Sequence, residues 1–148
     1  MAFDIRQQVF DRDGMPGKKA EQYLDQLMEF FVPSPEGQAL WNEGLEPDWA
    51  AMMIGFGMNY LGVTLPQLTP DGLREILFDL VPRKVSTSAD EAEEIVQELQ
   101  AFWTFLQREF SLANAAACLK VLDEKAAREL KKELSNLALA YVNMSKNK

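Results

Sequence analysis

Five carboxylates gather near the start of one predicted helix, and they are the side chains of this chain best suited to bind a cation. They are Asp90, Glu91, Glu93, Glu94 and Glu98. Glu91, Glu94 and Glu98 share one helical face, so their carboxylates would converge there. Di-iron bundles also need a Glu-x-x-His pair and facing glutamates, and the sequence contains no histidine. We therefore expect a solvated face that favours the helix N-terminus, with no metal and no other cofactor.

Nucleophilic catalysis has little support in the residue types. Without histidine there is no Ser-His-Asp or Cys-His arrangement and no imidazole base at neutral pH. The one cysteine, Cys118, lies in an alanine-rich run at 115–119, which is typical of a small buried residue on a helix face. Lys120 is the one nearby cation, and a reactive thiolate needs more positive charge than that. The sequence predicts no catalytic residue and favours a protein that is not an enzyme.

A cationic pair, Arg83 and Lys84, follows a predicted helix end. The helix dipole favours positive charge there. Two interpretations stay open. In the structural one, which the acid-rich start of the next helix favours, the pair caps the helix and binds those acids. In the functional one, the pair anchors an acidic partner.

Apolar residues on two predicted helices give a third candidate site. Met52, Met53, Phe56 and Trp103 would line a pocket for an apolar ligand if their side chains converged. The structural alternative is that Trp103, like the other tryptophans of the chain, belongs to the core, which the helical spacing of the tryptophans supports. Gly55-Phe56-Gly57 follows no strand, so it is not a nucleotide-binding loop. It indicates a close approach between helices.

The elements that must position these residues are helices. Apolar residues recur with the helical period, and no strand pattern of useful length appears. The predicted helices lie near residues 18–32, 34–44, 47–62, 69–81, 88–110, 111–122 and 123–142. The third is apolar on nearly every side, which predicts a central helix wrapped by the others. In the second, Ala39, Leu40 and Trp41 are expected to face inward.

Local signals set several of the helix ends. Ser34 and Thr69 are predicted N-caps, each followed by proline. Pro82 disfavours helical geometry at Val81, so the helix should end there and Pro82–Val85 should connect it to the next. Ser88 and Glu91 have the spacing of a capping box. Two helices show a clear apolar stripe. In the helix after Ser88 it consists of Ile95, Val96, Leu99, Phe102, Trp103 and Leu106, and in the last helix of Leu130, Leu134, Leu137 and Tyr141.

Length and composition favour one soluble all-α domain over residues 1–148, a bundle of about six or seven helices. Residues 1–17 are expected to form an irregular arm and residues 143–148 a frayed tail. The net charge of −8 opposes binding to nucleic acid or to anionic lipid. We see neither an apolar run long enough to span a membrane nor a signal-peptide pattern. A single cysteine cannot form an internal disulfide, so we expect a cytoplasmic protein.

Several segments resemble an uncharacterised family of all-helical bacterial proteins. They include the run from Phe31 to Glu36, the phrase Leu80–Val85 with its Pro-Arg-Lys-Val segment, and the run from Leu99 to Leu106. The resemblance covers most of the chain and implies a helical fold and a bacterial origin. Some similar proteins carry a Cys/His zinc module, which this chain lacks. The resemblance assigns no catalytic residue.

Three functions are compatible with these observations. The first is a non-enzymatic interaction module that binds a protein partner. The second is a small apolar-ligand carrier or enzyme with a pocket that the sequence does not reveal. The third is an acidic inhibitor or mimic that binds a basic partner, as the net charge suggests. The sequence leaves a homo-oligomer open and identifies no partner.

Overall fold

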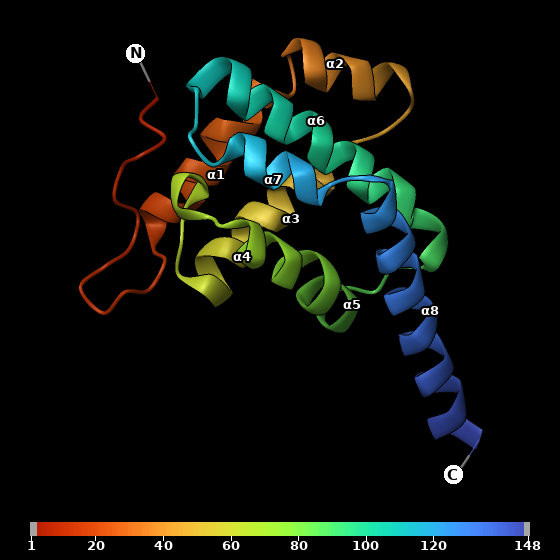
Figure 1. Ribbon diagram of the computed structural model, residues 1–148. Coiled ribbons are helices and arrows are strands. Elements are labelled where there is room, and N and C mark those ends of the chain that lie inside the picture. Colours follow the sequence, from red (N-terminus) through yellow and green to blue (C-terminus); the bar gives the residue numbers. More distant parts are fainter. Residues whose placement is uncertain (1–2, 147–148) are drawn as a thin grey trace.

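The computed structural model describes residues 3–146, without the side chains of Leu139 and of residues 141–146. Within that range the regular structure is helical, apart from one isolated bridge between Phe10 and Pro16. The α-helices are α1 (Lys18–Phe31), α2 (Pro35–Asn42), α3 (Asp48–Phe56), α4 (Pro70–Glu75), α5 (Val81–Lys84), α6 (Ala92–Phe110), α7 (Ala115–Val121) and α8 (Glu124–Lys146). Figure 1 shows them as one bundle, which confirms the all-α prediction.

Four shorter helical segments complete the chain path. Segments η2 (Leu65–Gln67) and η4 (Ala89–Glu91) are 3-10 turns, whereas η1 (Gly57–Leu61) and η3 (Ile76–Leu80) are π-helical. Because η3 joins α4 to α5 without a break, α4, η3 and α5 form one helical rod. Counted in this way, the described residues hold seven helical units, in agreement with the predicted six or seven.

The most enclosed helix is α6. It packs against α2, α3, α7 and α8, and Figure 1 shows it crossing the bundle. Its predicted stripe is buried throughout, at Ile95, Val96, Leu99, Phe102, Trp103 and Leu106. The prediction for the third helix needs correction. Helix α3 does lie between α1, α6 and η3, but it is not wrapped on every side, because Met52 and Phe56 are half-exposed and Tyr60, in η1, is 52% exposed.

The N-terminal arm is irregular, as predicted, and it is attached to α1. Ile5 and Val9 are buried in the core. The Tyr23 hydroxyl donates a hydrogen bond of 2.8 Å to the carbonyl of Ile5, and the Phe3 ring packs on the Tyr23 ring at a centroid distance of 5.3 Å. These contacts compensate for the missing regular structure of the arm.

The prediction that Pro82 ends its helix is wrong. Val81 is helical, with φ −60° and ψ −52°, and the rod continues to Lys84. The π-helical segment η3 ends two residues before this proline. A π turn shifts the backbone partner by one residue, which eases the clash of the proline ring and its lack of an N–H. The rod ends at Val85, where the backbone becomes extended.

The first turn of α2 is held by Ser34. Its hydroxyl accepts from the Gly37 N–H at 3.1 Å and donates to the Phe31 carbonyl at 2.6 Å, so the predicted N-cap is present. A Cβ atom at Gly37 would lie 2.2 Å from the Phe31 carbonyl oxygen. Only glycine fits there without a shift of the backbone.

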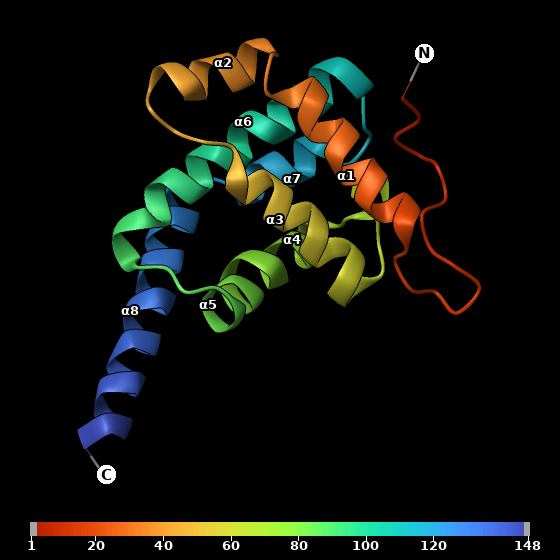
Figure 2. The same cartoon turned by 180° about the vertical axis from the view of Figure 1, so that it is seen from behind.

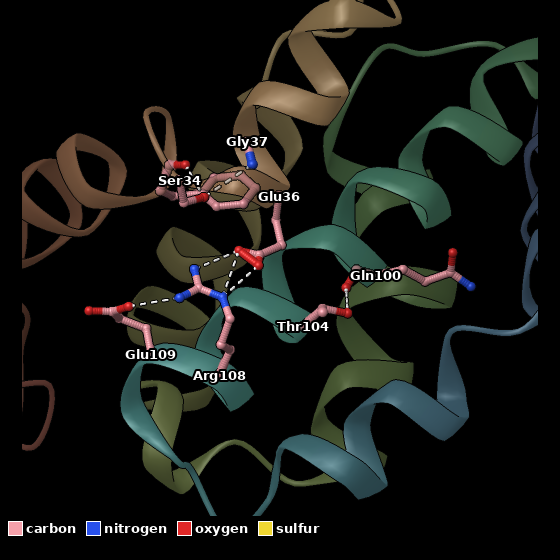
Figure 3. A network of polar contacts seen from close by, with 8 residues as sticks. Ser34, Glu36, Gly37, Gln100, Thr104, Arg108 and Glu109 are labelled. Atoms are coloured by element: carbon pink, nitrogen blue, oxygen red, sulfur yellow. Dashed lines mark hydrogen bonds and ion pairs between the residues drawn. The ribbon is translucent and has the colours of Figure 1, made fainter.

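An ion pair ties α2 to the end of α6. Arg108 donates to both carboxylate oxygens of Glu36, with distances of 2.7 and 2.9 Å for the shortest contact to each, and also to Glu109 at 3.0 Å. Figure 3 shows the guanidinium between the two acids. The pairing lowers the pKa of Glu36 and raises that of Arg108. Since Arg108 is exposed, the pair fixes orientation more than it adds stability.

Three further predictions differ from the structure. Ala39 and Trp41 face solvent rather than the core, and Trp41 is 62% exposed. Ser88 makes no side-chain capping bond, because a 3-10 turn precedes α6. Helix α7 begins at Ala115, not at Ser111, since Ser111 ends α6 in the left-handed region with φ 51°.

Helix α8 starts as predicted, with Asp123 accepting from the Ala126 N–H at 2.9 Å. Leu130 and Leu134 are buried and Leu137 is half-buried, whereas the side chain of Tyr141 lies outside the described residues. The helix continues to Lys146 and projects beyond the bundle in Figures 1 and 2. The predicted frayed tail is thus helical over residues 143–146, and residues 147–148 lie outside the described range. No helix within residues 3–146 is both long and apolar enough to cross a membrane.

Candidate functional site

The cationic pair lies on the last turn of the α4–η3–α5 rod. Arg83 donates from Nε and Nη2 to the two carboxylate oxygens of Asp79, at 2.8 and 2.9 Å. The pairing lowers the pKa of Asp79 and raises that of Arg83. The structural interpretation predicted a carboxylate partner from the next helix. The partner instead lies four residues earlier on the same rod, and both side chains are about half exposed.

Lys84 has a different environment. Its Nζ atom lies 5.5 Å from the centroid of the Tyr60 ring, a distance at which a cation is attracted to an aromatic face. Tyr60 belongs to η1, so this contact links the rod to the end of the α3 helix. Lys84 forms no salt bridge within the described residues.

A half-open groove of about 550 Å³ lies beside this pair, between the end of the rod and α8. We call it the α5–α8 groove. One wall comes from the rod and its connection, and the other from α8; Figure 2 shows the two walls next to each other. Its lining consists of Pro82, Arg83, Lys84, Val85, Ser86, Thr87, Leu134, Leu137 and Ala138.

The lining of the α5–α8 groove combines an apolar floor with one sign of charge. Leu134 and Pro82 are buried at its base, and Val85 and Leu137 are half-buried. Arg83 and Lys84 are the charged residues of its described lining, which contains no acid, although the whole chain has 23 acids against 15 bases. Such a surface suits an apolar segment that carries negative charge.

The four residues of the predicted ligand pocket do not line one cavity. Trp103 is fully buried, and its Nε1–H points at the Met53 sulfur at 3.3 Å, within the core. Met52 and Phe56 lie on the outer side of α3, where they border a shallow hollow together with Tyr60. Met52 and Phe56, at i and i+4, share this outer side of α3. Met53 is buried on the side of α3 that meets α6.

The acidic group also divides into two environments. Asp90, Glu91, Glu93 and Glu94 are exposed, as the solvated-face interpretation predicts, but Glu98 is only 2% exposed. The spacing of Glu98 from the apolar residues of α6 indicates that its side chain is buried, which its residue type alone does not. Glu98 stands three residues after Ile95 and four before Phe102, which places it on the buried stripe of α6.

Glu98 caps a second helix from the side. A carboxylate oxygen of Glu98 accepts a hydrogen bond from the backbone N–H of Ala50, in the first turn of α3. Burial raises the pKa of Glu98 to about 8, and the charge of Asp48 acts in the same direction, whereas the backbone N–H groups of Ala50 and Trp49 oppose it. Side chains at a helix N-terminus satisfy donors that lack a partner within the helix. The role of Glu98 is therefore structural.

Cys118 is fully buried, with Sγ 3.7 Å from the carbonyl of Leu68. Burial raises the pKa of its thiol to about 11. The thiol is thus protonated at neutral pH, and a protonated thiol is a weak nucleophile. This environment agrees with the prediction of a small residue packed on a helix face.

Comparisons of the chain with protein-family models, with curated proteins and with solved structures find no match. The resemblance of the Leu80–Val85 segment therefore stays a prediction.

Proposed function

We propose that the chain is a non-enzymatic interaction module that binds an acidic, partly apolar segment of a partner protein in the α5–α8 groove. The observation that carries this proposal is the lining of the groove. It holds an apolar floor and two basic side chains, and no acid is among its described lining residues. Arg83 is paired with Asp79 beside the groove, whereas Lys84 forms no salt bridge within the described residues. The basic side chains at the rim of the groove, Arg83 and Lys84, would attract an acidic segment. The apolar side chains of that segment would be transferred from water to the apolar floor of the groove.

The charge distribution of the sequence supports the same partner. Between residues 124 and 148 there are six Lys and Arg against three Asp and Glu, although the whole chain carries a net charge of −8. The net charge of this segment is therefore +3, although the residues of α8 that line the groove, Leu134, Leu137 and Ala138, are uncharged. This also disfavours a second copy of α8 as the occupant, because like charges would meet.

We also propose a bacterial and cytoplasmic setting. The resemblance supports the bacterial origin. The single cysteine, buried as a thiol, supports a compartment in which disulfides are not needed.

A peptide titration tests the proposed binding. The probe is a synthetic amphipathic peptide of leucine and glutamate, compared with a leucine–lysine peptide of the same pattern. We expect Lys84→Glu to raise the Kd of the acidic peptide about tenfold, because it reverses the charge at the rim. Ala138→Phe should also weaken binding, since it fills the groove from an exposed helical position.

The matched control is Lys131→Glu, which makes the same charge change on α8 outside the groove lining. It should leave the Kd nearly unchanged. Equal weakening by Lys84→Glu and Lys131→Glu would show that the peptide responds to overall charge, and the proposed groove would then be wrong.

A further inference from the structure

A second surface, which includes Tyr60, has apolar residues on its floor and acids along one edge. It lies between α1 and α3, which Figure 2 shows next to each other on one side of the bundle. We call it the α1–α3 face. Its apolar members are Leu24, Met28, Met52, Gly55, Phe56 and Tyr60.

Adjoining hollows make up this face. One, of about 420 Å³, lies between α1 and the end of α3 and includes Leu24 and Gly55. The next, of about 490 Å³, shares Gly55 and the exposed Asn59 with it and reaches Met52, Phe56 and Tyr60. A third, of about 530 Å³, lies further along α1 at Asp25, Met28 and Glu29 and shares no lining residue with these two. The first two hollows together join the start of α1 to the outer side of α3.

Gly55 keeps the middle of the face open. A Cβ atom there would meet no atom within 4 Å, so the expected close approach between helices does not occur at this residue. Glycine costs helical stability in such a position without a packing reason. Around it, Leu24, Met28, Met52 and Phe56 are half-buried, and Tyr60 is 52% exposed.

Successive ridges of α1 carry buried, half-buried apolar and exposed acidic residues. Tyr23 and Leu27 face the core, while Leu24 and Met28 form the next ridge, at i and i+4. The ridge beyond that carries three exposed acids, which are Glu21, Asp25 and Glu29. Lys18 is the one cation that lines the hollows. The apolar floor therefore has an acidic lip on the α1 side.

We propose that the α1–α3 face binds a basic amphipathic helix of a partner protein. Methionine side chains adapt to varied apolar surfaces, and an apolar groove that receives a helix reads a stripe of side chains at i, i+3, i+4 and i+7. The acids of the lip then pair with cations on the flank of that helix. This partner differs in charge from the acidic segment that we propose for the α5–α8 groove.

Binding of the leucine–lysine peptide tests the inference by fluorescence anisotropy. Gly55→Leu is the first variant, because its side chain enters open space and fills the floor while helix propensity rises. The second is Asp25→Lys with Glu29→Lys, which reverses the lip. We expect each to raise the Kd of the peptide about tenfold. Circular dichroism will verify that the variants are folded.

The matched control is Asp90→Lys with Glu94→Lys, two exposed acids outside the α1–α3 face. It makes the same change in net charge and should leave the Kd nearly unchanged. If this control weakens binding as much as the lip variant does, or if Gly55→Leu binds like the wild type, the inference is overturned. Self-association that Gly55→Leu abolishes would likewise overturn it, because a second copy would then be the occupant.

Discussion

The buried carboxyl of Glu98 has an ordinary pKa of 4.5 and a folded-state pKa of about 8. The folded protein therefore binds this proton more tightly than the unfolded chain between about pH 4.5 and 8. In that range the free energy of unfolding should fall as the pH rises, since the charged carboxylate is costly to keep buried.

Replacement of Glu98 by glutamine tests this dependence. Glutamine keeps a carbonyl acceptor for the Ala50 N–H and removes the ionisation. We expect the variant to lose most of the decrease in stability between pH 6 and pH 8, as measured by urea unfolding at each pH. An unchanged slope in the variant would show that other groups cause it.

Trp103 provides the second prediction at this scale. It is fully buried on α6, with Met53 at its indole nitrogen. Trp103→Ala should lower the free energy of unfolding by about 3–5 kcal/mol, as large core truncations do. Denaturant unfolding measures this loss, and a midpoint equal to that of the wild type would contradict the burial.

The third residue-scale prediction decides between the two interpretations of the cationic pair. Because Arg83 and Asp79 are both about half exposed, Arg83→Ala should barely move the denaturant midpoint. Lys84→Ala should behave in the same way. A large loss of stability in either variant would favour a structural role and weaken the case for the α5–α8 groove.

At the scale of the helices, replacing a glycine by alanine is expected to have opposite effects on stability at Gly37 and at Gly55. At Gly37 a Cβ atom would lie 2.2 Å from a backbone carbonyl oxygen, whereas at Gly55 it meets nothing within 4 Å. Gly37→Ala should therefore destabilise the protein, and Gly55→Ala should stabilise it by up to about 1 kcal/mol. Thermal unfolding of the two variants compares them directly, and a change of the same sign in both would contradict the packing described for α2 and α3.

The sequence predicted those features of the helices that depend on neighbouring residues, and it did not predict those that depend on the folded structure. The stripe of α6 and the cap at Ser34 could be predicted because they depend on neighbouring residues. The passage of a helix through Pro82 could not, because it depends on a π turn that forms within the folded rod. Burial of Glu98 was missed because this residue was grouped with the nearby acids, although its spacing from Ile95 and Phe102 places it on the apolar stripe. Its partner, the start of α3, is distant in the sequence.

At the scale of the whole molecule, the helices could be predicted from the sequence. Which of their faces remain exposed after packing could not. The pocket expected around Trp103 separates into a core contact and an outward face, because packing decides which side of α3 meets α6. The α5–α8 groove forms because Leu134 and Leu137 of α8 lie near Pro82 in α5. No local sequence pattern predicts that these two helices approach each other. Only the pair Arg83 and Lys84 was recognised in advance.

The central claim is that the α5–α8 groove is a binding surface for an acidic segment. An NMR titration of the labelled protein with the leucine–glutamate peptide tests it most directly, because backbone amide shifts report where the peptide sits. We predict that the largest shifts fall at Val85, Ser86 and Thr87 and on α8 around Leu134 to Ala138. Shifts concentrated on other surfaces, or none at saturating peptide, would contradict the claim.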